Sequence, residues 1–446
     1  MQVQVSLTLE VSATTGLADL EEAIVTQGRQ SMCRALQQAI RQWEQRQRRC
    51  PRCKNDDVRV EGTVGRRVLL VFGRVRLALR RYRCQHCLHR WCPARHLLRD
   101  LRGQQVSPGL REAAVLAGSS WPYRHATQLL ERLSGAQISA EELRQLTMQQ
   151  GEQQACVQQQ HAEQVLNAAP NEGKGEAGVV GMDGGWTHSC EQAGGMEGKV
   201  AVVACNKQVQ EPKAQPDPSQ LTWYELAKRS AKGKRLGPVH QRARWMKRCY
   251  VATFAPSKAL GILAEAAARE VGLDQAKSVV VADGAQWIKQ EAKQHFAKAT
   301  HILDWFHLWR VVRKAIRETQ RDQQYPETWL TEQITEIKSW LWHGEVDQAV
   351  KRLQSWQEKG EGKALKAAVT YLQEQREWIG SYEAWRQAGY PVGSGIIERA
   401  VSLVINRRMK RRGMRWKRDN ATALVTLRTD FLNADWQRHP SHRAFV

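Results

Sequence analysis

Short apolar runs alternate with amphipathic runs from residue 179 onward, and this alternation constrains the fold more than any other feature of the chain. Strands are expected at 179–185, 199–205 and 248–256, with a charged loop at 207–238 before the third. A helix follows, then a strand, a second helix and a final strand that ends at residue 304. This order predicts an α/β core.

Two acids interrupt the apolar runs of this core. Asp183 and Asp283 each lie in a predicted strand or at its end, and each is followed by Gly. The order of elements is that of a ribonuclease H-like core, and two such strands paired in one sheet would bring the acids within a few ångströms of each other. Their repulsion would favour a bound divalent cation. The alternative is that both acids cap turns.

A third acid, Glu398, lies in the segment PVGSGIIERAVSLVINRRMKRR. The Gly-Ser-Gly turn is expected to start a helix so apolar that it has almost no solvent face, which would bury Glu398. On a regular helix Glu398, Ser402 and Asn406 form one polar stripe. A metal shared with the two aspartates would give this carboxylate a partner.

An acid and an imidazole, Asp304 and His307, are spaced to share one face of a helix. They would serve as metal ligands, as a phosphate contact or as a hydrogen-bonded pair. We favour a structural role beside the acidic site.

Two CxxC pairs predict a structural zinc site. Each pair places two thiolates on one tight turn, and two pairs complete a tetrahedral set. Between them Arg74, Arg76 and Arg80 alternate with apolar residues, as in a half-buried strand with a basic face. The expected zinc ligands are Cys50, Cys53, Cys84 and Cys87.

This zinc ribbon is typical of nucleic-acid-binding modules, with a purely structural cap as the alternative. A thioredoxin-like redox pair would have a single CxxC at the start of a helix in a parallel α/β unit. Four further residues are candidate substitutes but are not expected to bind the metal: Cys92, His86, His89 and His96.

Positive charge is concentrated in two segments. The chain has 68 Lys and Arg against 45 Asp and Glu, a net charge of +23, of which residues 41–102 carry +13 and residues 399–418 carry +9. Such patches predict a polyanionic partner. The second begins beside Glu398 and would hold phosphates near the acids, with a solvated helix end as the alternative; Trp416 within it is a candidate for base stacking. Its cations are Arg399, Arg407, Arg408, Lys410, Arg411, Arg412, Arg415, Lys417 and Arg418.

Residues 107–150 contain three short amphipathic stretches, which suit either a helix-turn-helix or an ordinary helical hairpin. No apolar run approaches the length of a membrane-spanning helix, and the first ten residues lack the pattern of an export signal. We therefore expect a cytoplasmic protein that does not enter a membrane and whose cysteines stay reduced.

Four segments together resemble bacterial insertion-sequence DDE transposases of the ISKra type, relatives of the Mutator-like transposases. The segments are MDGGWTH, VVADGAQWI, HILDWFHLWR and GSGIIERAVSLVINRRMKRRGMRW. The resemblance implies that Asp183, Asp283 and Glu398 are the catalytic triad and that Asp304 and His307 form the family's Asp-x-x-His signature. It also implies an all-helical insertion before the catalytic helix.

The activity implied by the resemblance is DNA cleavage at the element's ends followed by strand transfer, with two Mg²⁺ (or Mn²⁺) ions held by the triad. The partners would be double-stranded DNA of the element's ends and target, bound by a homodimer or larger assembly associated with the nucleoid. A DNA-binding protein without catalysis, or a ribonuclease H-like nuclease without strand joining, are the alternatives.

We therefore expect a multidomain α/β protein with a ribonuclease H-like core. A helical segment at 1–49 would precede the zinc ribbon at 50–102, the helical DNA-binding region at 103–169 and a linker at 170–178. The core would comprise 179–307, an all-α insertion at 308–390, and a catalytic helix with its basic segment at 391–432, before a tail at 433–446.

Overall fold

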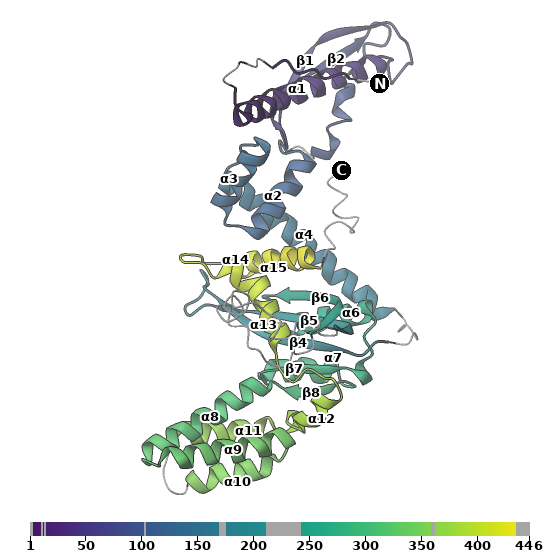
Figure 1. Ribbon diagram of the computed structural model, residues 1–446. Helices are drawn as coiled ribbons and strands as arrows, with labels where there is room; N and C mark the ends of the chain where they lie inside the picture. The colour runs from purple at the N-terminus through teal and green to yellow at the C-terminus, as the bar shows by residue number, and fades with distance from the viewer. Residues whose placement is uncertain are drawn as a thin grey trace. The chain divides into compact units, whose positions relative to one another are not determined.

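The protein has a multidomain α/β fold. Its structure, a computed structural model, describes residues 3–9, 12, 15–101, 104–168, 175–210, 242–357 and 362–433. The chain divides into two compact units, one formed by residues up to Gln153 and the other by Gln154–Asn433 (Figure 1). Within the described ranges, no helix combines the length and the apolarity needed to cross a membrane.

The first unit begins with a helix packed on a three-stranded antiparallel sheet. Helix α1 (Leu17–Arg46) lies against β2 (Gly73–Cys84), where Gln37 donates to the carbonyl of Ala78 and accepts from its N–H. β2 pairs with β1 (Val58–Leu70) and with the short β3 (Arg90–Trp91). Along β2 the apolar residues from Val75 to Leu79 are buried in alternation, as predicted for a half-buried strand.

Three helices follow in the positions that the sequence predicts. They are α2 (Pro108–Ser120), α3 (Tyr123–Ser134) and α4 (Ala140–Asn167). The Ser107 hydroxyl accepts from the Leu110 N–H at the start of α2, and Gly135, with φ +75°, ends α3. The choice between a helix-turn-helix and a hairpin stays a prediction. The predicted linker lies largely outside the described residues.

The second unit is built on a mixed five-stranded sheet in the order β6-β5-β4-β7-β8 (Figure 1). The first three strands are antiparallel neighbours, whereas β4, β7 and β8 are parallel. The strands are β4 (Gly178–Thr187), β5 (Met196–Gln210), β6 (Arg242–Thr253), β7 (Val279–Ala282) and β8 (Thr300–Leu303). All five predicted strands are present.

The predicted loop at 207–238 begins too early. Residues 207–210 belong to β5, because the β5–β6 pairing continues through Lys207 opposite Trp245 to Gln210 opposite Arg242. The rest of the predicted loop, residues 211–238, lies outside the described residues.

Helices cover the sheet of the second unit. α6 (Ser257–Val271) packs on β5 and β6, and α7 (Gln286–His295) packs on α6. α13 (Gly395–Val401) lies across β4 and β5, and α15 (Arg418–Leu432) packs on β6 (Figure 1).

A group of helices separates β8 from α13. It comprises α8 (Trp305–Asp322), α9 (Glu327–His343), α10 (Val346–Gln357), α11 (Lys363–Glu374) and α12 (Tyr382–Gln387). The first helix starts at Trp305, three residues before the predicted boundary. Short 3₁₀ turns occur elsewhere, at Pro93–Arg95, Arg99–Leu101, Gln275–Lys277 and Arg376–Trp378.

The helix that carries Glu398 is not regular. After α13 the backbone makes a π-helical turn at Ser402–Asn406 and then continues as α14 (Arg407–Met409). Partly buried Arg428 on α15 donates to the carbonyls of Leu403 and Val404 in this turn. The straight polar stripe predicted through Ser402 to Asn406 is therefore wrong, because a π turn rotates the residues after it.

Candidate carboxylate and zinc centres

Strands β4 and β7 carry Asp183 and Asp283 to the same edge of the sheet. The strands are parallel neighbours, with Val179 opposite Val279 and Gly181 opposite Val281. Both acids lie two residues beyond this last pair. Because adjacent strands are about 4.8 Å apart, the common register brings the two backbones close together at the acids.

Two glycines allow α13 to approach the face of β4 that carries Asp183. Side chains alternate along a strand, so Gly181, Asp183 and Gly185 share one face. A Cβ at Gly181 would lie 2.9 Å from the Cβ of Ile397, and one at Gly185 would lie 2.7 Å from a side chain of the π turn. Glu398 follows Ile397 directly, so the backbone of the third acid lies close to this face of the sheet.

The surroundings of Asp183 disfavour its charged form. Burial raises the pKa of Asp183 to about 6 together with the negative charges of Asp283, Glu398 and Glu197, although the Gly184 N–H donates to its Oδ1 at 2.7 Å. Asp283 and Glu398 thus both lie within electrostatic reach of Asp183.

Glu197 is an acid near this site that no sequence motif singles out. It lies on β5 opposite Trp186 and forms an ion pair with Lys199 at 3.8 Å. By strand alternation it belongs to the sheet face opposite Asp183. An isolated Glu at the start of an apolar run carries no motif, so only the register of β4 with β5 reveals it.

The three carboxylates do not form a closed set of ligands. Among the described residues only four cysteines place three or more potential ligand atoms within 4.8 Å of one another. Glu398 is exposed, which corrects the prediction that it is buried, because α13 buries only the side formed by Ile397, Ala400 and Val401. Its Oε1 accepts from the Ser394 hydroxyl at 3.1 Å.

This donor set suits a hard divalent cation. Carboxylate oxygens are the ligands that Mg²⁺ prefers, and a cation would offset the repulsion that raises the pKa of Asp183. The exposure of Glu398 leaves the set open on one side, where a substrate phosphate could approach.

The helical insertion braces the turn after Asp283. The Ala285 N–H donates to Asp283 Oδ1 at 3.0 Å. From the insertion, the Tyr371 hydroxyl donates to the Asp283 carbonyl at 3.1 Å, and the Gln375 side-chain amide donates to the Gly284 carbonyl at 3.1 Å. Gly284 has φ +87°, a conformation that favours glycine. These contacts hold the second acid at the sheet edge.

Asp304 connects the insertion to the turn before α13. It is buried, and its Oδ1 caps α8 by accepting from the His307 backbone N–H at 2.6 Å. Its Oδ2 accepts from the Ser394 N–H. The His307 ring instead contacts Arg310, with 2.5 Å between Nε2 and Nη2. The contacts of Asp304 are those of the structural role that we favour from the sequence.

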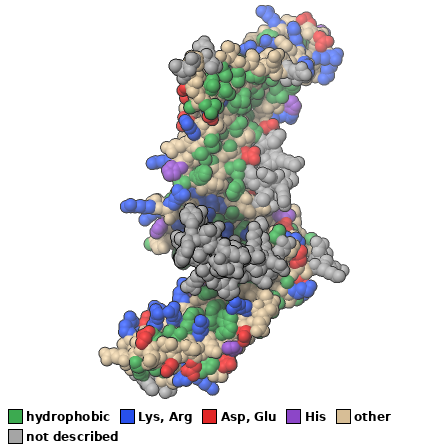
Figure 2. Space-filling model, in the orientation of Figure 1, with side chains coloured by type: hydrophobic (Ala, Val, Ile, Leu, Met, Phe, Trp, Pro, Cys, Tyr) green, Lys and Arg blue, Asp and Glu red, His purple; other side chains and the backbone are tan. Residues whose placement is uncertain are grey.

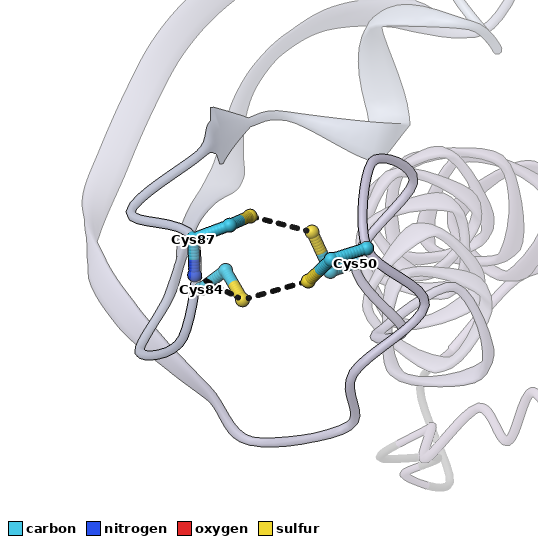
Figure 3. Close-up of side chains that lie close together, drawn as sticks. Cys50, Cys84 and Cys87 are labelled. Carbon is cyan, nitrogen blue, oxygen red and sulfur yellow. Dashed lines mark hydrogen bonds between the residues drawn. The ribbon is translucent and has the colours of Figure 1, made fainter.

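The four cysteines converge from two turns of matching geometry (Figure 3). In each turn the N–H of the first cysteine donates to the carbonyl five residues later, from Cys50 to Asn55 at 3.0 Å and from Cys84 to His89 at 2.9 Å. The residue after each second cysteine has a positive φ, 60° at Lys54 and 59° at Leu88. Two equivalent knuckles are what a shared metal requires.

The sulfur atoms are already close together. Cys50 Sγ lies 3.6 Å from Cys87 Sγ, and Cys53 Sγ lies 3.5 Å from Cys84 Sγ (Figure 3). Burial opposes ionisation of Cys50, but hydrogen bonds from the N–H groups of Cys53 and Arg52 and from the thiols of Cys87 and Cys53 together lower its pKa to about 6. The set could bind a metal such as zinc, and none of the four substitute candidates belongs to it.

Part of the chain matches the model of a protein family. Residues 257–440 match the model of a family described as Uncharacterised protein family (UPF0236). This family is found in bacterial mobile-element-associated proteins. No curated protein matches the sequence. The UPF0236 match contains Asp283, Asp304 and Glu398, but it excludes Asp183 and the four cysteines.

The basic segment after Glu398 lies within the UPF0236 match. Eight of its nine predicted phosphate-binding cations are exposed, and Arg408 is the exception. Arg408 is 1% exposed and stacks over the Trp416 ring at 5.3 Å. Trp416 is itself buried and donates from Nε1 to the Met409 carbonyl, so neither residue is placed to contact DNA as predicted.

Proposed function

We propose that the protein is a DDE transposase of an insertion sequence, which binds the ends of its element and cleaves and joins DNA strands by divalent-metal-dependent phosphoryl transfer. The observation that carries this proposal is the convergence of Asp183, Asp283 and Glu398 from β4, the end of β7 and α13. The match to a family found in mobile-element-associated proteins supports it.

The sheet order supports a ribonuclease H-like core. Three antiparallel strands followed by two parallel ones, with helices between the parallel strands, place the acid of the first strand beside that of the fourth. The helical insertion then returns the chain to α13, whose Glu398 is close enough to Asp183 to raise its pKa.

In this proposal Asp183, Asp283 and Glu398 would hold two Mg²⁺ ions. Bound Mg²⁺ supplies charge stabilisation to the attacking and leaving oxygens of an in-line displacement. Asp183 and Asp283 are fixed by the sheet register, and Ser394 orients Glu398 through its hydroxyl. The exposed cations that follow Glu398 would bind phosphates of the scissile strand.

The zinc ribbon would supply a second DNA contact. Arg67 and Arg76 lie directly opposite each other on β1 and β2 and are both exposed. Like charges in this position destabilise a sheet. No ion pair joins either one to an acid in the part of the chain that the structure describes. A polyanion such as the DNA backbone would balance them.

A cleavage and joining assay with the DNA of the element's own ends and Mg²⁺ tests the proposal. We expect wild-type protein to cut and join, and Asp283→Asn to lower the rate by about a thousandfold while leaving DNA binding largely intact. Asp419→Asn, which neutralises an exposed acid on α15, is the matched control and should retain the rate.

Each other outcome selects another function. Cutting without joining indicates a ribonuclease H-like nuclease, and binding without cutting indicates a DNA-binding protein. An Asp283→Asn protein that cuts and joins at the wild-type rate overturns the proposed active site.

A further inference from the structure

Helix α8 carries a row of cations that the charge distribution of the sequence does not reveal. All are exposed, and their spacings of one, three or four residues place them along one side of the helix. They are Arg310, Arg313, Lys314, Arg317 and Arg321. Figure 2 shows Lys and Arg side chains gathered over the part of the second unit where Figure 1 labels α8.

The charge of this row is only partly balanced. Lys314 lies 3.8 Å from Glu318, and Arg321 lies 3.8 Å from Asp322, at the outer limit of an ion pair. The described residues include no acid that pairs with Arg313 or with Arg317. Lys338 on α9 adds a further exposed cation, with its Nζ 6.0 Å from the Trp309 ring.

The surface beside these cations is hollowed and partly aromatic. A groove of about 460 Å³ runs along α8, and it is lined by Phe306, Trp309, the five cations and Glu318. Phe306 is 71% exposed, so its ring is accessible at the start of this groove. Cations with exposed rings are the combination that binds nucleic-acid backbones and bases.

The groove begins beside the carboxylate site. A Cβ at Gly393 would lie 2.8 Å from the Phe306 ring, so this ring covers the turn before α13. The next residue, Ser394, donates to Glu398. At the same end of α8, Arg310 contacts His307, and its positive charge opposes the rise that burial causes in the pKa of Tyr371. The Tyr371 hydroxyl donates to the Asp283 carbonyl.

We propose that this α8 groove binds the phosphate backbone of double-stranded DNA and leads it to the carboxylate site. The inference rests on the proposed function and names a DNA contact beyond the basic segment after Glu398. Arg310 and Arg321 are 11 residues apart, which is about 16 Å along a helix. That distance corresponds to about five base pairs of duplex.

The proposal is tested by the salt dependence of DNA binding, measured by fluorescence anisotropy with the full chain and a labelled duplex. The α8 variant is Arg313→Gln with Lys314→Gln and Arg317→Gln. If all three cations contact phosphates, the slope of log K against log salt becomes shallower by about 2.7, or about 0.9 for each phosphate that the variant no longer neutralises.

The control variant removes the same charge from other exposed positions of the insertion. It is Lys351→Gln with Lys363→Gln and Lys366→Gln, on α10 and α11. We expect its slope to equal that of the wild type. Equal slopes for the wild type and the α8 variant contradict the proposal that the groove binds DNA. An equal change of slope in the α8 variant and the control variant also contradicts it, because such a change would reflect net charge alone.

The result also separates this inference from the proposed function. Wild-type protein that cleaves and joins DNA while the α8 variant keeps the wild-type slope contradicts only the groove. Wild-type protein that does not bind duplex DNA contradicts both.

Discussion

The cysteine cluster of the first unit and the carboxylate cluster of the second differ in how completely the fold assembles them. The four sulfur ligands lie within 4.8 Å of one another, whereas the three carboxylates do not form such a set and Glu398 is exposed. Each cysteine pair comes from one tight turn, so its two ligands are placed by local geometry. The acids come from three separate elements and repel one another, as the raised pKa of Asp183 indicates.

This difference matches two uses of a metal. A closed site holds its ion for stability, and an open site keeps a position for substrate. We therefore expect loss of the first metal to affect folding, and loss of the second to affect mainly activity.

The largest expected effect is on the proposed zinc ribbon. Replacing Cys50 and Cys84 by Ser removes one ligand from each knuckle and should abolish zinc binding and unfold the ribbon, because a structural zinc contributes about 10–16 kcal/mol to the folding of small domains. Zinc content by mass spectrometry and limited proteolysis of residues 50–101 check this result. The control replaces the exposed Cys156 and Cys190 by Ser. A wild-type protein that is fully folded without zinc would contradict the assignment.

A smaller effect, of opposite sign, is expected at the carboxylate site. The pKa of Asp183 is raised from an ordinary 3.8 to about 6, so the folded state holds this proton more tightly than the unfolded state does. Without divalent cations, stability should therefore fall as the pH rises from about 4 to 6 and stay low above it. Asp183→Asn removes this loss, and at pH 7 it should stabilise the protein by about 1 kcal/mol, or about 2–4 °C in Tm.

Scanning calorimetry in Mg²⁺-free buffer, without a chelator that would remove zinc, measures this effect. Adding Mg²⁺ at pH 7 should raise the Tm of the wild type and leave that of Asp183→Asn unchanged. If the plots of Tm against pH run parallel for the two proteins, ionisation of Asp183 does not cause the loss of stability.

The sequence predicts those parts of both centres that depend on local patterns. Alternating or continuous apolar runs locate the strands, and the position of each acid relative to its run places Asp183 and Asp283 at one sheet edge. The CxxC spacing alone indicates both knuckles, since all their geometry lies within a few residues.

The rest depends on contacts between distant residues. The π turn after α13 is held by Arg428, and Arg408 is buried by Trp416, which a local reading of a basic segment does not anticipate. Glu398 is exposed because only one side of its helix meets the sheet. The row on α8 does not stand out in the sequence because Glu318 and Asp322 reduce the net charge of that segment. In the structure these two acids do not line the whole length of the groove.

The smallest expected effect resolves which charges act on Asp183. Asp283, Glu398 and Glu197 raise its pKa in that order, and Glu197 acts from the opposite face of the sheet. Neutralising each by Asp283→Asn, Glu398→Gln or Glu197→Gln should lower the pH midpoint of the Asp183-dependent stability loss, most for Asp283 and least for Glu197. The midpoint comes from comparing each variant with its Asp183→Asn double mutant, which isolates the coupling between the two sites.

The control is Glu332→Gln, which neutralises an exposed acid on α9 and should leave the midpoint unchanged. If the shift for Glu197→Gln equals or exceeds that for Asp283→Asn, Glu197 belongs to the acidic site although it lies on the opposite face of the sheet. The open centre would then comprise four carboxylates instead of three.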